Sequence, residues 1–400
     1  MTAHTLISLR NAPNSLTPFY RDFRVAERLL LTGHSHQAWP DCAKQGMLQA
    51  YEDAAGLIDH KWERAFAKAD RVRQGFADLL GCDPQQIALG QSTHELIIRF
   101  LSALPLRTRP RLITTDGEFH TLRRQLARVS EEGIEVIRVA SQPSTSLTER
   151  LCAEVKNSGD RVSAVLVSSV LFMTSDIISG LPVLQTICNQ YGVSLLLDVY
   201  HQLNVVPFDA SGLDQAFVVG GGYKYCQLGE GNCFLRIPEG CKFRPVVTGW
   251  YAEFGLLAQT PNGELSYSEI GSQRFAGATY DPTSHYRGAT VFEFFRQQDL
   301  TAGFLRQVNQ HQMQLLVDGF LALDLDPQKI KLATTDHVAQ VGGFLALRSP
   351  HAKPLCDALI KQGVDVDQRG EILRLGPAPY LCDAQLKQAM EILGQTVRKF

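Results

Sequence analysis

The sequence predicts an α/β protein in which a mainly parallel sheet is flanked by helices and followed by a smaller α+β unit. Short apolar runs alternate with amphipathic stretches between residues 111 and 219, which is the pattern of repeated strand–helix units. Two of the runs, Ser163–Ser169 and Val193–Asp198, are almost uninterrupted, as in strands that are covered on both faces. We expect these two strands at the centre of the sheet.

The remaining elements follow from the same periodicity. Residues 41–80 have apolar side chains three or four apart and end at Gly81, which predicts helices. Between 111 and 219 the expected strands and helices occupy residues 111–115, 121–131, 134–139, 146–156, 163–171, 182–191, 193–198 and 216–219. A long amphipathic stretch over 286–323 precedes a smaller mixed unit. We therefore expect an N-terminal arm and helix over 1–56, a large α/β domain over 57–285 and a small α+β domain over 286–400.

Composition argues for a small-molecule partner. Lys and Arg number 39 against 41 Asp and Glu, the net charge is −2, and no basic run is present, so we expect no nucleic acid or membrane partner. Residues 1–10 lack the charged and apolar segments of an export signal. The nine cysteines are scattered and form no C-x-x-C pair, which favours reduced thiols, a cytoplasmic location and no metal site.

Residues that can take part in catalysis lie at or just after the ends of two neighbouring strands. Asp198 ends an apolar strand and His201 follows three residues later; the carboxylate is either a helix cap or a site group. The next strand, 216–219, leads through the glycines at 220–222 to Lys224. A lysine after a buried strand can act as a Schiff-base nucleophile, because desolvation lowers its pKa.

An aspartate and a lysine at one sheet edge meet the needs of pyridoxal phosphate (PLP). The lysine binds the cofactor covalently, and the anion keeps the ring nitrogen protonated, which improves the ring as an electron sink. The glycines do not match the G-x-G-x-x-G spacing of a dinucleotide loop, so a nicotinamide cofactor is disfavoured.

The same residues carry a family resemblance. Asp198-x-x-His201, then Gly222-Tyr223-Lys224-Tyr225 and Gly229-x-Gly231, resemble the D-x-x-H and S-Y-K-Y-x-x-x-G-x-G block of kynureninases, within the class V aminotransferase group. Weaker similarities extend the match over about residues 90–380. The resemblance implies the PLP-dependent transferase fold type I with a seven-stranded-type sheet, PLP as cofactor, and a homodimer with a shared active site.

The resemblance also implies roles for individual residues near the cofactor. Lys224 would hold PLP and move protons, Asp198 would pair with the ring nitrogen, and His201 would lie near the ring hydroxyl. Tyr223 would contact the phosphate and serve as a general acid or base. The remaining cofactor contacts would come from Ser92, Thr93, Phe119, Trp250 and, across the dimer interface, Thr279. Ordinary alternatives stay open: Ser92 and Thr93 as an N-cap, His201 as a hydrogen-bonded core histidine, and Tyr223, Phe119 and Trp250 as packing residues.

Substrate contacts are expected from four further residues. Arg374 would bind the substrate carboxylate through two parallel hydrogen bonds, with a structural salt bridge as the alternative. His60, Trp62 and Tyr280 would lie near the substrate side chain, although helix packing explains the first two equally well. The sequence departs from kynureninases at Leu122, Tyr200, Tyr280 and Asp281, which puts recognition of the aminobenzoyl group in question.

The favoured hypothesis is a PLP-dependent hydrolase that cleaves the Cβ–Cγ bond of kynurenine or 3-hydroxykynurenine, giving alanine and an anthranilate-type acid. A second hypothesis is another class V reaction, namely transamination, β-elimination or cysteine desulfuration. A third is a catalytically silent regulatory module. The complete set of Asp198, His201, Lys224 and Arg374 argues against the third, because a scaffold has no need of it.

Overall fold

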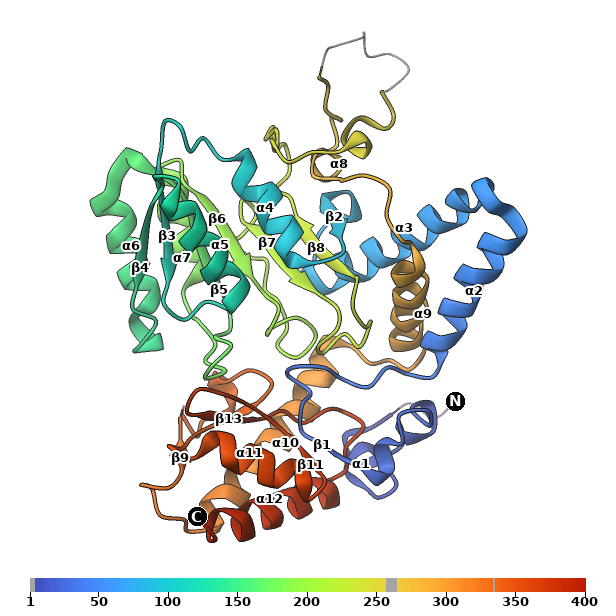
Figure 1. Ribbon diagram of the computed structural model, residues 1–400, viewed down its shortest axis with the longest axis vertical. Coiled ribbons are helices and arrows are strands. Elements are labelled where there is room, and N and C mark those ends of the chain that lie inside the picture. The colour runs from blue at the N-terminus through green and yellow to red at the C-terminus, as the bar shows by residue number, and fades with distance from the viewer. Residues whose placement is uncertain (1–3, 257–264, 334) are drawn as a thin grey trace.

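The computed structural model describes residues 4–256, 265–333 and 335–400. Residues 1–3 of the expected N-terminal arm, 257–264 of the expected large domain and 334 of the expected small domain lie outside the described residues. A seven-stranded sheet with flanking helices forms the upper body in Figure 1, and a smaller unit of helices and short strands forms the lower body. The predicted α/β class is confirmed.

The large sheet is mainly parallel, as predicted. Six of its seven strands run in one direction. The seventh, β8, runs the opposite way and is antiparallel to its neighbours β7 and β2. Across the sheet the strands are β2 (Ile87–Gly90), β8 (Cys233–Arg236), β7 (Phe217–Gly221), β6 (Ser194–Asp198), β5 (Val162–Ser168), β3 (Arg111–Thr115) and β4 (Glu135–Val139). The two apolar runs singled out in the sequence form β5 and β6, and β6 is the central strand.

Alternating side chains of the strands enter two different cores. Leu195 and Leu197 of β6 point to the face covered by α3 (Lys61–Leu80), α6 (Leu147–Ser158) and α7 (Leu181–Gln190), whereas Leu196 points to the face covered by α4 (Thr93–Ala103) and α5 (His120–Glu131). Burial on both faces explains why the strand sequences show no polar alternation. Helix α3 follows the predicted spacing and ends at Gly81, which adopts the left-handed conformation that glycine tolerates.

Helices α2 (Cys42–Leu57) and α9 (Thr283–Gln297) pack against each other, and α9 also packs on α3. The boundary predicted at residue 285 falls in the first turn of α9. Because α9 contacts α3, it belongs to the large body. The chain turns at Asp299, which has a positive φ of 51°, before α10 begins. We therefore propose that the large domain continues to this turn.

The smaller body combines α10 (Ala302–Ala322), α11 (Ala352–Lys361) and α12 (Asp383–Val397) with an antiparallel sheet. Its strands are β12 (Asp367–Arg369), β13 (Ile372–Leu375), β10 (Leu345–Arg348) and β9 (Lys331–Leu332). The N-terminal arm joins this body rather than standing apart. It contributes α1 (Leu6–Arg10) and β1 (Leu29–Leu30), and β1 pairs in parallel with β11 (Val364–Asp365). The chain ends of Figure 1 thus lie in the same body.

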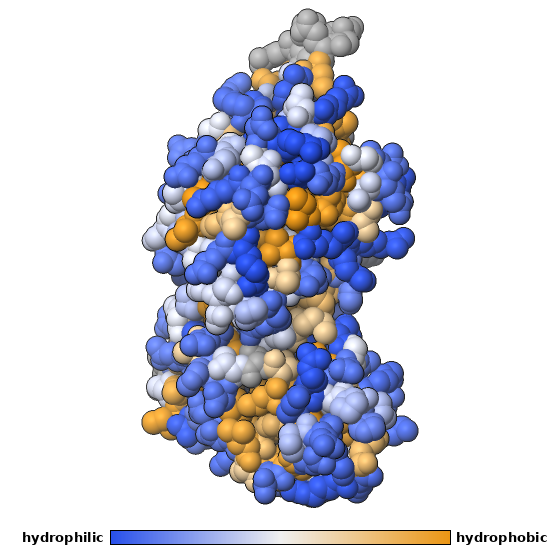
Figure 2. Space-filling view, turned by 90° about the vertical axis from the view of Figure 1, so that its left-hand side faces the viewer, coloured by the Kyte–Doolittle hydropathy of each residue, from blue (hydrophilic) through white to orange (hydrophobic). Residues whose placement is uncertain are grey.

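The surface on the α6 side is shown in Figure 2. Polar residues cover most of this face, and hydrophobic residues form separate smaller groups. No helix among the described residues is both long and apolar enough to cross a lipid bilayer.

Candidate functional site

The carboxyl ends of β6 and β7 bring the predicted aspartate, histidine and lysine together. The two strands pair in parallel, with Asp198 opposite Val219, so their ends lie at one edge of the sheet. The chain after β7 turns back there, and Lys224 Nζ lies 2.6 Å from Nε2 of His201. Open α/β sheets bind ligands at this kind of edge.

Lys224 is buried among aromatic rings. Its Nζ lies 4.7 Å from the ring centroid of Tyr200, 5.7 Å from that of Phe119 and 5.9 Å from that of Tyr223. Burial lowers the pKa of Lys224 to about 7, against the opposing effect of the Asp198 carboxylate. A large fraction of the amine is therefore uncharged and nucleophilic at neutral pH.

His201 is a neutral partner for this amine. Burial holds its pKa well below the usual value, and the charge of Lys224 acts in the same direction. Its Nδ1 is buried and has no hydrogen-bond partner among the described residues. An orphaned ring nitrogen in the interior carries a cost unless another group pairs with it, so the histidine is suited to contact a ligand.

Asp198 is at once a turn residue and a site residue, so both sequence interpretations apply. Its Oδ1 accepts a hydrogen bond of 2.9 Å from the backbone N–H of Tyr200. Burial raises the pKa of Asp198, while that hydrogen bond and the charge of Lys224 lower it. A buried carboxylate with few donors favours a cationic partner.

Glu118 is a second buried carboxyl near this edge, and the sequence analysis gave it no role. It accepts hydrogen bonds from the Thr115 hydroxyl at 2.6 Å and from the Ser168 hydroxyl and N–H at 2.5 and 3.2 Å. Burial nevertheless raises its pKa to about 7, and the charge of Asp198 adds to the rise. The carboxyl links the ends of β3 and β5 beside Asp198.

A small cavity lies over these strand ends. Its volume is about 30 Å³, because the Lys224 side chain extends between the surrounding rings. Gly221 makes room for Tyr200, since a Cβ at residue 221 would lie 2.4 Å from the Tyr200 hydroxyl. The cavity is lined by Thr93, Ile97, Phe119, Thr121, Leu122, Ser168, Val170, Phe172, Asp198, Tyr200, His201, Tyr223 and Lys224.

The start of α4 borders the same cavity. Ser92 is the N-cap, and its hydroxyl accepts a 3.3 Å hydrogen bond from the N–H of Glu95. Thr93 lines the cavity, whereas Ser92 does not. The cap alternative for Ser92 is thus present in the structure, and a helix start with a hydroxyl facing the cavity suits an anion.

Arg374 lies buried beside the site in an ion pair. Its Nε and Nη2 donate to the two carboxylate oxygens of Asp367 at 2.8 and 2.5 Å, and Nη1 donates to the carbonyl of Phe172 at 2.7 Å. The structural salt bridge kept as an alternative therefore exists. His34 also contacts Asp367, and no local sequence signal indicated it, since it comes from the distant N-terminal arm.

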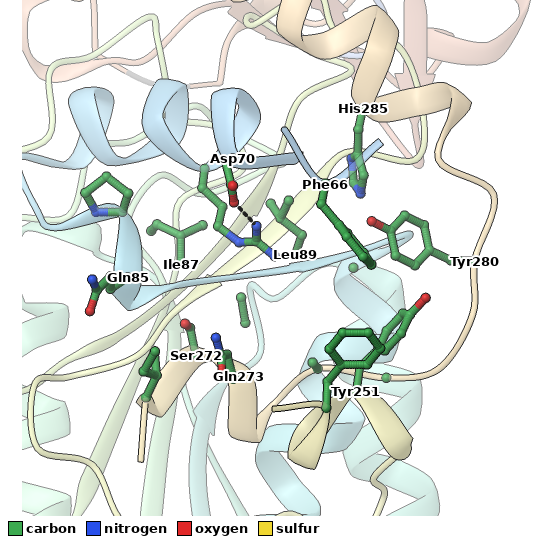
Figure 3. Close-up of a pocket in the computed structure, with 18 of the residues that line it drawn as sticks. Phe66, Asp70, Gln85, Ile87, Leu89, Tyr251, Ser272, Gln273, Tyr280 and His285 are labelled. Atoms are coloured by element: carbon green, nitrogen blue, oxygen red, sulfur yellow. Dashed lines mark hydrogen bonds and ion pairs between the residues drawn. The ribbon is translucent and has the colours of Figure 1, made fainter. Parts of the chain in front are cut away.

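Five of the predicted residues lie away from the Lys224 cavity within one subunit. Tyr280 lines a second cavity of about 670 Å³, drawn in Figure 3, where its ring lies near those of Phe66, Tyr251 and His285. Trp62 packs edge-on against Tyr280 at 5.8 Å, Thr279 hydrogen-bonds Tyr251, and His60 and Trp250 are exposed. These residues come from the turn before α3, from α3 itself and from the segment after β8, so one chain alone does not bring them to Lys224.

The two cavities flank the first turn of α4. Gln91 and Glu95 line the larger one, whereas Thr93 and Ile97 line the smaller one. The larger cavity contains Asp70 and Arg73, which pair with each other at 2.6 Å, but the described residues that line it include no lysine and no buried side-chain nitrogen without a hydrogen-bond partner. We therefore assign the chemistry to the smaller cavity despite its size.

The residues around Lys224 fit PLP. They offer an uncharged buried amine, a carboxylate, an unpaired ring nitrogen at His201 and a flat aromatic side chain at Phe119. Covalent attachment requires Lys224 to give up its hydrogen bond to His201. Within the described ranges, no cluster of three or more His, Cys, Asp or Glu side chains is arranged to hold a metal ion, and the nine cysteines are free thiols.

Comparisons with known proteins agree with this cofactor. Residues 300–393 match the family model for the kynureninase C-terminal domain. The kynureninase of Burkholderia mallei strain SAVP1 is 27% identical over 390 residues, covering 91% of this chain and 88% of that protein. The kynureninase of Deinococcus radiodurans is 25% identical over 334 residues, covering 81% and 77%.

A solved structure supports the fold. It is a C-DES mutant with glycine covalently linked to its PLP cofactor, and it superposes with a TM-score of 0.81 at 16% identity, covering 94% of this chain and 98% of that one. Another structure of the same protein describes it as a cystine C–S lyase. The predicted fold type I is therefore confirmed, and the predicted PLP cofactor agrees with the cofactor that is bound in this relative.

Proposed function

We propose that the chain is a kynureninase-like enzyme of the class V aminotransferase group that uses PLP and hydrolyses the Cβ–Cγ bond of kynurenine or 3-hydroxykynurenine. The products are alanine and an anthranilate-type acid. The single structural observation that carries the proposal is the buried contact between Lys224 and His201 beside Asp198. The similarity to kynureninases along about nine-tenths of the chain supports the choice of substrate.

The cofactor, when bound, supplies an electron sink for the charge left on the substrate carbon. The residues of the chain hold it and move protons. Lys224 would hold the cofactor and would act as the base at the substrate Cα. Asp198 would pair with the ring nitrogen, and His201 would offer Nδ1 or Nε2 to the ring hydroxyl. Thr93 and Ser92 would bind the phosphate at the start of a helix.

Tyr223 is the proposed general acid. Burial raises its pKa to about 12, so its hydroxyl keeps its proton at neutral pH and can donate it to Cβ after the bond breaks. The ring is held between two others: His36 stacks on it with centroids 4.8 Å apart, and Tyr200 lies 4.9 Å away. A fixed ring orients the hydroxyl for transfer.

Arg374 is the proposed contact of the substrate carboxylate. A guanidinium has five N–H donors, and the bonds to Asp367 and Phe172 use three of them. The remaining two match a carboxylate. The ion pair with Asp367 thus supports the arginine's orientation and does not exclude a ligand.

A second candidate is C–S bond cleavage, as by the cystine C–S lyase that shares the fold, or the desulfurase reaction. A desulfurase needs a reactive thiolate. Cys356 is buried, donates to the carbonyl of Val366 at 3.6 Å and has its pKa raised by burial, and Cys382 is also buried. These surroundings favour the hydrolase over a desulfurase. A silent regulatory module is disfavoured by the nucleophilic state of Lys224.

The proposal includes a cytoplasmic homodimer with shared sites. Several large hydrophobic side chains are exposed on α2, on the turn that follows it and on the segment after β8. They are Met47, Leu48, Tyr51, Ile58, Val246, Val247, Trp250, Phe254, Leu265 and Ile270. Exposed apolar residues in such a group favour a protein interface. In this arrangement Thr279 and Trp250 reach the neighbour's phosphate and Tyr280, Trp62 and His60 its substrate.

The substrate proposal is tested with purified, PLP-loaded protein and a panel of amino acids. Alanine and the aromatic acid are quantified from L-kynurenine and 3-hydroxykynurenine, and sulfide and pyruvate from cystine and cysteine. Aromatic acid and alanine in equal amounts support the hydrolase. Sulfide release without them moves the function to C–S bond cleavage, and no product at all from a PLP-loaded sample supports the silent module. Sedimentation of the same sample tests the dimer.

A further inference from the structure

The N-terminal arm lies directly against the strand that holds Arg374. The N–H of Gly33 donates to the carbonyl of Gly376 at 2.8 Å, and the N–H of Gly376 donates to the carbonyl of Leu31 at 2.7 Å. A Cβ at residue 376 would lie 2.3 Å from Nδ1 of His34, so glycine at that position is what allows the approach. The arm therefore holds His34 against Gly376, which follows Arg374 by two residues in the sequence.

His34 is buried, and it contacts the ion pair behind Arg374. Its Nε2 lies 2.8 Å from Oδ1 of Asp367, the same oxygen that accepts from Nε of Arg374. Burial lowers the pKa of His34 to about 4, against the effect of Asp367. The imidazole is thus neutral at pH 7. Because a carboxylate only accepts, Nε2 must carry the proton that it shares with Asp367.

The Asp367 carboxylate accepts hydrogen bonds from Nε2 of His34 and from Nε and Nη2 of Arg374, and Nη2 of Arg369 lies 3.7 Å from its Oδ2. Asp367 lies on β12 opposite Arg374 on β13, and it receives the side edge of the guanidinium. Without His34, Oδ1 would lose one donor and the carboxylate could rotate about its own bond. The rotation would in turn release the guanidinium of Arg374 from its present orientation.

We propose that His34 is a positioning residue for substrate carboxylate recognition: its hydrogen bond to Asp367 fixes the guanidinium of Arg374. This inference rests on the carboxylate-binding role proposed for Arg374 above. His34 does not touch the substrate in this account. The selectivity of the site for amino acids over amines thus depends on His34, a residue of the N-terminal arm that lies about 340 residues before Arg374 in the chain.

The chain offers a close test because the packing of His34 can be kept. Its ring lies 4.6 Å from that of Phe344, which also contacts the guanidinium of Arg374 at 5.5 Å. His34→Phe keeps an aromatic ring there and removes the donor. His34→Gln keeps an N–H donor near the position of Nε2. His337→Gln, an exposed histidine paired with its neighbour Asp336 at 3.9 Å, is the matched control.

The experiment measures binding and not turnover. Each PLP-loaded variant is titrated with L-phenylalanine and with phenethylamine, which lacks the carboxylate, and the change in cofactor absorption gives two dissociation constants. The expected result is that His34→Phe weakens L-phenylalanine binding about tenfold and phenethylamine binding no more than about twofold, as for loss of a hydrogen bond to a charged group. His34→Gln should restore most of the difference, and His337→Gln should match the parent protein.

Arg374→Ala separates this inference from the proposed function. If Arg374→Ala leaves the preference for L-phenylalanine unchanged, the carboxylate role of Arg374 is wrong. If Arg374→Ala abolishes the preference while His34→Phe retains it, only the role of His34 is wrong. Equal weakening of both ligands by His34→Phe would show a structural role and overturn the inference. If His34→Phe does not fold, Asp367→Asn replaces it, with the same selective loss expected.

Discussion

Nζ of Lys224 lies 2.6 Å from Nε2 of His201, so two basic groups share one hydrogen bond in the interior. Burial lowers the pKa of both, because neither charge is solvated, and the charge of Lys224 lowers the pKa of His201 further. Lys224 is the one whose pKa falls near neutrality. The contact therefore keeps an attacking amine available without a strong base beside it.

The uptake of PLP by the cofactor-free protein should depend on pH through Lys224. Because its pKa is lowered to about 7, the fraction of free amine rises as the pH increases through 7 and is nearly complete one to two units above it. We expect the rate constant for attachment, followed by absorbance, to rise with a midpoint near pH 7. Lys224→Ala should show no attachment. A midpoint near pH 10 would mean that the lysine is solvated.

Asp198→Asn should impair catalysis more than folding. The amide can still accept from the N–H of Tyr200, so the turn after β6 is kept and the thermal midpoint should change little. Loss of a paired carboxylate typically lowers the pKa of its cationic partner, here the ring nitrogen of PLP, by about 1–3 units. The equilibrium constant for protonation of that nitrogen then falls about 10- to 1,000-fold. Product formation should fall within that range. A variant with unchanged turnover would remove Asp198 from the cofactor site.

Glu118→Gln should change how stability depends on pH. Burial raises the folded-state pKa of Glu118 from 4.5 to about 7, so the folded protein binds this proton more tightly than the unfolded chain. The stabilising contribution of protonated Glu118 to the free energy of unfolding is fully present below pH 4.5 and is lost as the pH rises through 7. A shift of this size corresponds to about 3 kcal/mol as an upper estimate.

Urea unfolding at pH 5 and pH 8 measures the effect. The parent protein should lose more unfolding free energy between the two values than Glu118→Gln, by about 1–3 kcal/mol. Equal losses in both proteins would mean that Glu118 is ionised at both pH values.

Gly221→Ala should destabilise the end of β7. The new Cβ would lie 2.4 Å from the hydroxyl of Tyr200 and 2.6 Å from Sγ of Cys233, and overpacking of a core typically costs about 1–3 kcal/mol. Tyr200→Phe removes the closer atom, so the double variant should regain part of the loss in thermal unfolding. A double variant no more stable than Gly221→Ala would show that the hydroxyl is not the decisive clash, because Cζ of residue 200 and Sγ of Cys233 both stay 2.6 Å from the new Cβ.

The sequence allowed the central strands and the lysine segment to be predicted because their signals are local. The apolar runs at Ser163–Ser169 and Val193–Asp198 formed β5 and β6, and the glycines before Lys224 marked the close approach of Tyr200 and Leu228. The lysine and His201 lie together because parallel neighbours end at one edge.

Other features depend on pairings between distant segments. The pairing of Asp367 with Arg374 follows from the register of β12 and β13, and His34 arrives through a bridge between Thr32 and Gly376. No periodicity encodes either contact. The positions of Trp62, Trp250, Thr279 and Tyr280 relative to the site depend on a second subunit in our proposal, and a single chain's sequence pattern does not specify that arrangement.

The most direct test of the central claim follows L-kynurenine in the presence of PLP-loaded protein. We expect anthranilate fluorescence to appear together with one equivalent of alanine, and both to be lost in Lys224→Ala. The same pair of products from 3-hydroxykynurenine would rank the two substrates. A PLP-loaded sample that shows the absorption of the lysine-bound cofactor yet leaves both compounds intact would contradict the account.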